Sequence, residues 1–115
     1  MIVVSLFKQY MCAYDVMDNC SLQENNISDR GVEELSKGLV KNKSLQFLGL
    51  QYNDISNTGA LYLGKSIRSN LALKTLYLFG NRINEHGMGE AVHSMAWTQA
   101  NQVMFDIPVG EHVMK

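Results

Sequence analysis

The feature that most constrains the fold is a short pattern, L-x-x-L-x-L-x-x-N, that recurs at a fixed interval. It occurs without substitution at Leu45–Asn53 and again at Leu73–Asn81. The step from Leu45 to Leu73 defines the period, and a softened copy, with methionine and cysteine in place of two leucines, stands one period earlier at Met17–Asn25. Self-similarity at a period of this size is typical of stacked repeat proteins. We therefore expect a solenoid of similar units.

The residues between these patterns also match at the same interval. Each pattern is followed by an isoleucine, a good helix N-cap residue and a glycine; the predicted N-caps are Ser28, Ser56 and Asn84. Apolar residues then recur at the spacing of a helix with one buried face, at Val32/Leu35/Leu39, Ala60/Leu63/Ile67 and Met88/Ala91/Met95. Each unit is predicted to be strand, turn and helix, and Asn42, Asn70 and Thr98 close the three helices.

Two further sets of recurring residues are interpreted as structural. The asparagines that end each pattern should be buried in the turn, where a side-chain amide bonds backbone groups left without partners by the bend. This predicts a structural asparagine ladder of Asn25, Asn53 and Asn81. The recurring glycines, Gly31, Gly59 and Gly87, fall in the first helical turn, where a side chain would collide with the neighbouring unit.

The period, the L-x-x-L-x-L-x-x-N-x-I run and the following x-x-x-G-x-x-x-L helix pattern resemble the ribonuclease-inhibitor class of leucine-rich repeats. That class includes the sensing ends of nucleotide-binding immune receptors and the GTPase-activating protein for Ran. The resemblance covers about residues 17–100. It implies an α/β leucine-rich repeat solenoid, with a short curved parallel sheet on the concave side, helices on the convex side, and a role in binding other proteins. This chain is much shorter than the familiar members.

The whole chain, residues 1–115, is expected to be a single leucine-rich repeat domain. Its predicted units are an N-terminal half-repeat or cap at 1–16, repeats at 17–44, 45–72 and 73–101, and a C-terminal cap strand and tail at 102–115. The first segment, Met1–Tyr14, is predicted to be the helical half of a preceding repeat. In the alternative interpretation, Ile2–Phe7 is a short strand, because β-branched residues dominate it.

The C-terminal unit departs from the period. Strict register would place Asp106 in the core, where an unpaired charge is costly. A one-residue insertion near Trp97–Asn101 avoids this, brings Phe105 and Ile107 inward, and makes Gln102–Val109 the last strand.

The residues between the strand leucines should face out of the concave sheet, because side chains alternate along a strand. Four of the nine phenylalanines and tyrosines fall there, and exposed aromatic patches usually mark contact with a partner. The predicted partner-binding residues are Phe47, Gln51, Tyr52, Thr75, Tyr77, Phe79, Gln23 and Glu24. In the alternative interpretation, Tyr52 and Phe79 shield the sheet edge, or the rings pack on a neighbouring copy.

Other polar groups give no sign of catalysis. His86, Glu90 and His93 share one face of a predicted helix with metal-ligand spacing, but a solvated face is the expectation, with no metal and no cofactor. Arg30 and Arg82 lie in strand-to-helix loops, where a GTPase activator would place a catalytic group; we expect them to solvate the loops. Lysines and arginines cluster near helix ends, as a solvated rim or as a surface for an acidic partner: Lys37, Lys41, Lys43, Lys65 and Arg68.

Composition narrows the classes of partner and location. Ten basic and eleven acidic side chains give a net charge of −1, so nucleic acid is not an expected partner. The two cysteines, Cys12 and Cys20, are expected to be reduced and packed. The sequence predicts neither a signal peptide nor a membrane span, which favours a cytoplasmic protein without membrane contact.

These observations favour a non-enzymatic protein-binding module, acting as a small adaptor or scaffold or as a subunit of a larger assembly. Its repeat ends would then allow self-association or incorporation into a complex. The alternatives are a regulator of a GTPase or another enzyme, similar to the Ran activator or the ribonuclease inhibitor, or a fragment of an innate immune receptor.

Overall fold

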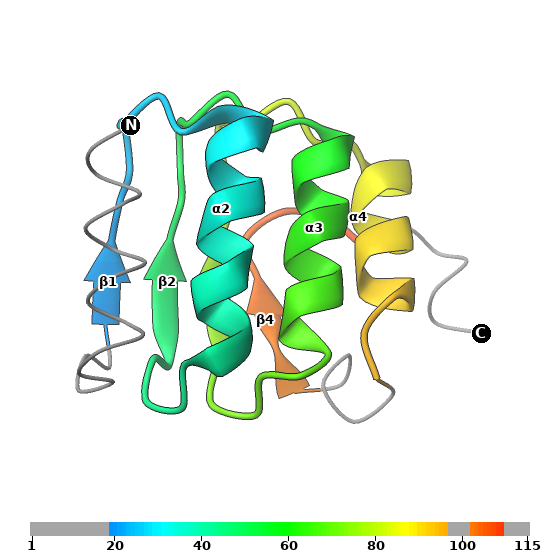
Figure 1. Cartoon of the computed structure of the whole chain (residues 1–115). Helices are drawn as coiled ribbons and strands as arrows, with labels where there is room; N and C mark the ends of the chain where they lie inside the picture. Colours follow the sequence, from blue (N-terminus) through cyan, green and yellow to red (C-terminus); the bar gives the residue numbers. More distant parts are fainter. Residues whose placement is uncertain (1–18, 97–101, 110–115) are drawn as a thin grey trace.

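The computed structural model describes residues 19–96 and 102–109, in which short strands alternate with helices. Their order is β1 (Asn19–Ser21), α2 (Ser28–Lys41), β2 (Phe47–Gly49), α3 (Asn57–Ile67), β3 (Thr75–Tyr77), α4 (Glu85–His93) and β4 (Met104–Phe105). The helices form a layer over one face of the sheet, with α2 packed on α3 and α3 on α4 (Figure 1). The predicted α/β leucine-rich repeat architecture is thereby confirmed.

The sheet is parallel and its strands follow chain order, β1-β2-β3-β4. Cys20 pairs with Leu48, and Leu48 pairs with Leu76, so partners on neighbouring strands are one sequence period apart. The strands point towards one edge of the molecule, and the helices run back towards the other (Figure 1). All strand-to-helix turns therefore lie along one edge, and all helix-to-strand loops along the opposite one.

The core lies between the sheet and the helices. Every leucine of the two complete sequence patterns is buried there, together with the predicted apolar face of each helix. The fully enclosed side chains include Leu35, Leu39, Leu48, Leu63 and Leu76. Each such side chain contributes roughly 1.5 to 3 kcal/mol relative to an exposed one, so hydrophobic burial holds the two layers together.

Asn53 connects two successive turns, and it is fully buried. Its side-chain oxygen accepts hydrogen bonds from the N–H groups of Asn25 (2.8 Å) and Ile27 (3.2 Å). Its side-chain nitrogen donates to the carbonyls of Leu22 (2.9 Å) and Gln51 (3.1 Å). One side chain thus bonds four backbone groups that belong to two successive turns.

Asn81 repeats this arrangement one unit later. It accepts from the N–H groups of Asn53 and Ile55, both at 2.9 Å, and donates to the Leu50 and Leu78 carbonyls at 2.9 and 2.8 Å. Asn25 donates to two carbonyls of its own turn. Asn25 and Asn81 are only half-buried, which differs from the complete burial expected for all three.

The helix N-termini follow the prediction at two of three positions. Ser56 and Asn84 have extended backbones, and their side chains accept from Thr58 N–H and Gly87 N–H. Ser28 makes no such bond, so its predicted capping role is wrong. Its φ of 61° is left-handed, and its N–H donates to the Asn53 carbonyl, so it lacks the extended backbone that N-cap residues adopt.

Asp29 links the start of α2 to the start of α3. Its carboxylate accepts from the hydroxyl and the N–H of Ser56 and from the N–H of Gly59 at 3.1 Å. A negative group is stabilising at a helix N-terminus. A Cβ on Gly59 would collide with this carboxylate and with Ile55, which explains the glycine in the first turn.

A second line of asparagines fixes the helix-to-strand loops. The side-chain oxygen of Asn42 accepts from the N–H groups of Ser44 and Leu45, and that of Asn70 accepts from Ala72 and Leu73. Asn70 also donates across the stack to carbonyls of the preceding unit. Both asparagines are buried, so they fix the loops through the interior.

The last strand shows the predicted insertion and is shorter than predicted. Leu76 pairs with Phe105, which is one residue beyond the sequence period, and both Phe105 and Ile107 pack against the core. Asp106 is exposed, as the insertion required. The strand ends at Phe105 because the Asp106 carboxylate accepts from Leu78 N–H (2.5 Å) and Phe79 N–H, where a continuing strand would have placed its carbonyl groups. The predicted strand Gln102–Val109 is therefore wrong in length.

Four expectations lie outside the described residues. They are the helix or strand within Met1–Tyr14, the state of Cys12, the closing of the third helix by Thr98, and the position of the insertion at Trp97–Asn101. Cys20 is a free, buried thiol, as expected.

The buried amide of Asn53 gives a stability prediction. In Asn53→Ala, the N–H groups of Asn25 and Ile27 lose their acceptor inside the protein, and each buried unsatisfied group costs about 1 to 3 kcal/mol. We expect the free energy of unfolding to fall by about 3 kcal/mol in urea titrations followed by circular dichroism. Asn57→Ala, at a half-buried site with weaker bonds, is the control; an equal loss in both variants would contradict the ladder's role.

The buried thiol gives a pH prediction. Burial raises the pKa of Cys20 from 9.0 to about 11, because the thiolate is poorly solvated in the core. Between these values the unfolded chain loses the proton and the folded chain keeps it, so stability is complete below pH 9 and falls as the pH rises towards 11. The loss should reach about 2 kcal/mol. Cys20→Ala should show a correspondingly shallower decline over this range in the same titrations, and parallel curves would argue against it.

Candidate functional site

The candidate site is the sheet face opposite the helices, here called the open face. Register places its residues in rows across neighbouring strands. Asn19, Phe47, Thr75 and Met104 form one row, and Ser21, Gly49 and Tyr77 form the next. These positions alternate with buried core residues, so their side chains lie on the other side of the sheet. The structure thus brings Phe47, Thr75 and Tyr77 together, as the alternation predicted.

The two strand aromatics are partly covered. Phe47 and Tyr77 are half-buried, and Gly49 lies beside them as a buried position without a side chain. The fold therefore presents two partly covered rings on adjacent strands, next to a gap in the row of side chains. Rings held in this way bring apolar area to a contact at low entropic cost.

Gln51 extends over this gap. A Cβ on Gly49 would lie 2.9 Å from the Gln51 side-chain oxygen, so the glycine makes room for the amide. The same oxygen is buried and has no hydrogen-bond partner among the described residues. A buried acceptor without a donor is costly, and a donor from outside the chain would remove that cost.

Tyr52 and Phe79 lie at the carboxyl ends of β2 and β3. Their rings make an edge-to-face contact with centroids 6.0 Å apart, and Tyr52 N–H donates to the Phe79 carbonyl at 3.1 Å. They remain 51% and 55% exposed. The Tyr52 ring also lies against the backbone of Gly80, whose φ of 82° and lack of a Cβ permit this approach. The pair covers part of the turn and still presents a large aromatic area.

The other predicted residues lie at the margin of this surface. Gln23 and Glu24 are exposed in the turn after β1, and Glu24 N–H donates to the Gln51 carbonyl at 2.9 Å. Met104 was not predicted, yet it is 70% exposed and pairs with Thr75. The one-residue insertion that turns Phe105 inward also turns Met104 outward. The predicted insertion could therefore have identified Met104 as a residue of the open face.

The possible metal ligands on α4 do not form a centre. His86 and Glu90 make an ion pair at 3.0 Å when the histidine is protonated, and both are exposed. Neither 19–96 nor 102–109 contains a group of three potential ligand side chains placed to hold a metal ion.

The two arginines considered for GTPase activation lie apart from the open face. Arg30 is exposed on the first helical turn of α2, and Arg82 forms an ion pair with Asp54 at 2.5 Å. An exposed pair of this kind contributes little to stability. The ion pair of Arg82 and Asp54 is therefore a solvent-exposed contact between two loops.

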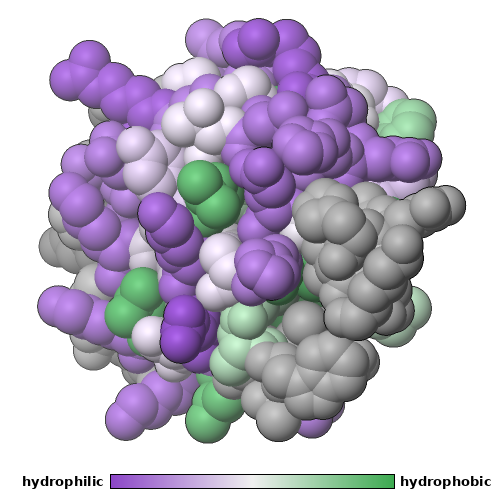
Figure 2. Space-filling model, turned by 90° about the vertical axis from the view of Figure 1, so that its right-hand side faces the viewer, coloured by the Kyte–Doolittle hydropathy of each residue, from purple (hydrophilic) through white to green (hydrophobic). Residues whose placement is uncertain are grey.

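Figure 2 views the α4 end of the stack, where the described surface is mostly hydrophilic and its hydrophobic residues form small, separate areas. In the part of the chain that is described, no helix has the length and apolar character needed to cross a membrane.

Comparison with known families agrees with this geometry. A family model described as leucine-rich repeat matches residues 21–36 and 41–64, from the end of β1 through most of α3. The described part of the chain has an α/β leucine-rich repeat fold. Domains of this family generally mediate protein–protein interaction and are typically not enzymes. A comparison of the sequence with curated proteins found no match.

Proposed function

We propose that this leucine-rich repeat protein is a non-enzymatic adaptor, scaffold or assembly subunit that binds a protein partner through its open face. The observation that supports this most strongly is that four aromatic residues lie on adjacent strands and the turns after them: Phe47, Tyr77, Tyr52 and Phe79. Aromatic side chains are enriched among the residues that dominate binding energy at protein interfaces. The fold alone carries no such information, because the same repeats serve many roles.

The unpartnered oxygen of Gln51 defines one expected feature of the partner. Gln51 lies between Phe47 and Tyr52 along the chain, and its oxygen lies beside the side-chain gap at Gly49. A donor group on the partner, such as a backbone N–H or a side-chain amide, would complete this acceptor. A partner that covers this face would exclude water and strengthen that bond. The proposed site therefore combines apolar contact with one directional hydrogen bond.

The proposal also includes the subtype and setting expected from the sequence. The hydrogen bonds from Asn25 N–H to Asn53 and from Asn53 N–H to Asn81 each join positions 28 apart. This interval supports assignment to the ribonuclease-inhibitor-like class, with repeats at 17–44, 45–72 and 73–101. A cytoplasmic location accompanies that class. Nucleic acid and membrane are not among the partners we propose.

The partner-binding proposal is tested with the double variant Phe47→Ala/Tyr77→Ala. Both rings are half-buried on the open face, and truncating two central aromatics typically costs more than about 1 kcal/mol each. We expect at least about a tenfold loss of specific partners, measured by quantitative mass spectrometry after capture from native lysate. Circular dichroism checks that the variant is folded.

The matched control is Thr58→Ala/Leu61→Ala on α3, which lies in the helical layer. It should recover the same partners as the unmodified chain. Undiminished recovery by the folded open-face variant would place the binding site elsewhere. Gln51→Ala should weaken binding less than the double variant, because one hydrogen bond contributes less than two buried rings.

A further inference from the structure

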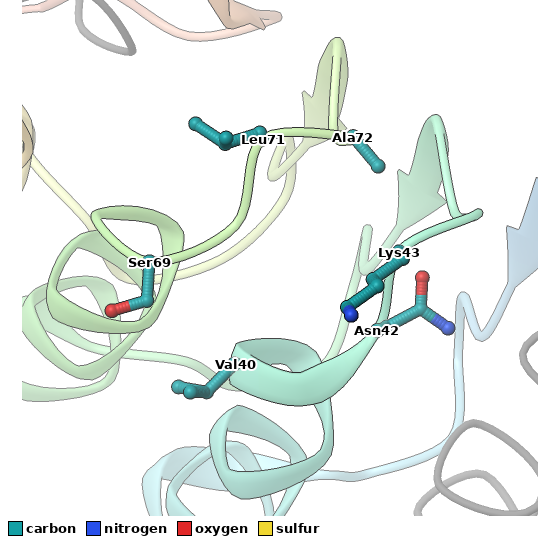
Figure 3. A pocket seen from close by; sticks show the side chains of 6 residues that line it. All are labelled: Val40, Asn42, Lys43, Ser69, Leu71 and Ala72. Atoms are coloured by element: carbon teal, nitrogen blue, oxygen red, sulfur yellow. The ribbon is translucent and has the colours of Figure 1, made fainter.

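A cleft of about 360 Å³ opens between the ends of α2 and α3, on the edge of the molecule that carries the helix-to-strand loops. Figure 3 shows Val40 at one side, Leu71 and Ala72 at the opposite side, and Ser69 and Lys43 between them. Asn42 completes the lining. The cleft lies at the loop edge of the repeats, so it is separate from the open face.

The cleft presents an apolar side chain on a fixed backbone. Leu71 is 84% exposed and Val40 is 42% exposed, although each is next to a buried residue. The loop that carries Leu71 is fixed by Asn70, whose side chain accepts from Ala72 N–H and Leu73 N–H, both at 2.8 Å. A partner that covers Leu71 would therefore gain apolar burial without the entropic cost of ordering the loop.

The two segments that line the cleft carry charges of one sign. The segments 40–46 and 68–75 contain Lys41, Lys43, Arg68 and Lys74 and no acidic residue. On the opposite edge, acidic side chains lie in the turns and in the first turns of α2 and α4: Glu24, Asp29, Asp54, Glu85 and Asp106. A chain with a net charge of −1 thus has a locally basic edge, here called the basic rim and defined by Lys41, Arg68 and Lys74; Lys43 already makes a contact of its own and is not counted.

Helix dipoles explain only part of this rim. Lys41 lies in the last turn of α2 and Arg68 is the C-cap of α3, where cations offset the partial negative charge of the helix end. Lys74 stands outside both helices, directly before β3, and is exposed. Its charge is therefore available to a partner without loss of helix stability.

We infer that the cleft docks an acidic segment of another protein, with an apolar side chain between Val40 and Leu71 and flanking carboxylates on the basic rim. Charge complementarity favours an acidic chain, and the exposed leucine requires an apolar anchor on it. Single-stranded nucleic acid fits less well, because stacking sites use aromatic side chains and none lines the cleft.

The test is an array of short immobilised peptides probed with the folded chain. The peptides carry a central leucine flanked by Asp and Glu, by Ser and Gly, or by Lys, and a further set has Ser in place of the leucine. We expect retention on the acidic peptides with leucine above all others. The affinity of the best of these, labelled with fluorescein, is then measured by anisotropy, with an oligouridine as competitor.

Three variants assign the binding to the cleft. Leu71→Asn should weaken binding about tenfold, because the complex loses the burial of one leucine side chain. The variant should still fold, because Leu71 is exposed in the free chain. Lys74→Glu should weaken it about fivefold and reduce its salt dependence. Arg30→Glu makes the same charge change on the opposite edge and should have no effect.

The open-face variant Phe47→Ala/Tyr77→Ala should also bind the acidic peptide normally, so failure of either proposal is distinguishable from failure of the other. The inference is overturned if the serine-substituted acidic peptides bind equally well, or if Leu71→Asn has no effect. It is also overturned if oligouridine binds the rim more tightly than every peptide, or if lysine-flanked peptides are retained as strongly as acidic ones.

Discussion

The hydrogen bonds made by Asn53 and Asn81 are the constraint on which the rest of the structure depends. Each side chain satisfies backbone groups of its own turn and of the preceding turn. Removing one unit would leave buried N–H and C=O groups in its neighbour without partners, at a cost comparable to the stability of a small domain. The repeats are therefore stable only as a stack, and stability is shared between neighbours.

Each edge of the sheet is fixed by its own set of polar contacts. Asp29 and the turn asparagines hold the strand-to-helix edge, while Asn42 and Asn70 hold the loop edge through the interior. The two proposed docking surfaces depend on this. The open face needs strands in fixed register, and the cleft needs the loop of Leu71 to stay in place. Both surfaces are therefore preformed, which lowers the entropic cost of binding.

The sequence predicted the features that depend only on where a residue stands within the repeated pattern. The core leucines, the asparagine positions and the inward turn of Phe105 and Ile107 follow from alternation and from the cost of burying a charge. The Ser28 prediction failed because a capping preference is local, whereas the backbone there is held by Asn53 of the next unit. The last strand was predicted too long because nothing local shows that the Asp106 side chain replaces backbone acceptors.

The candidate site was partly predictable, because strand alternation follows directly from the repeated pattern. Phe47, Thr75 and Tyr77 were placed on one face by strand alternation, and the structure adds their order across the sheet. Gln51 was identified as a surface residue, but its unpartnered oxygen depends on the absent side chain of Gly49 on the same strand. The cleft could not be predicted, because Val40 lies in the last turn of α2 and Leu71 in the loop after α3, and these two positions meet only in the folded stack.

The Asp106 carboxylate has a consequence for assembly. By accepting from Leu78 and Phe79, it occupies donors of the segment directly after β3 that an added strand from another molecule would need. A strand arriving there would have to displace a charged acceptor and find new solvation for it. The last turn of the sheet is thus protected against strand addition, and aggregation through that part of the edge is disfavoured even though the parallel sheet is short.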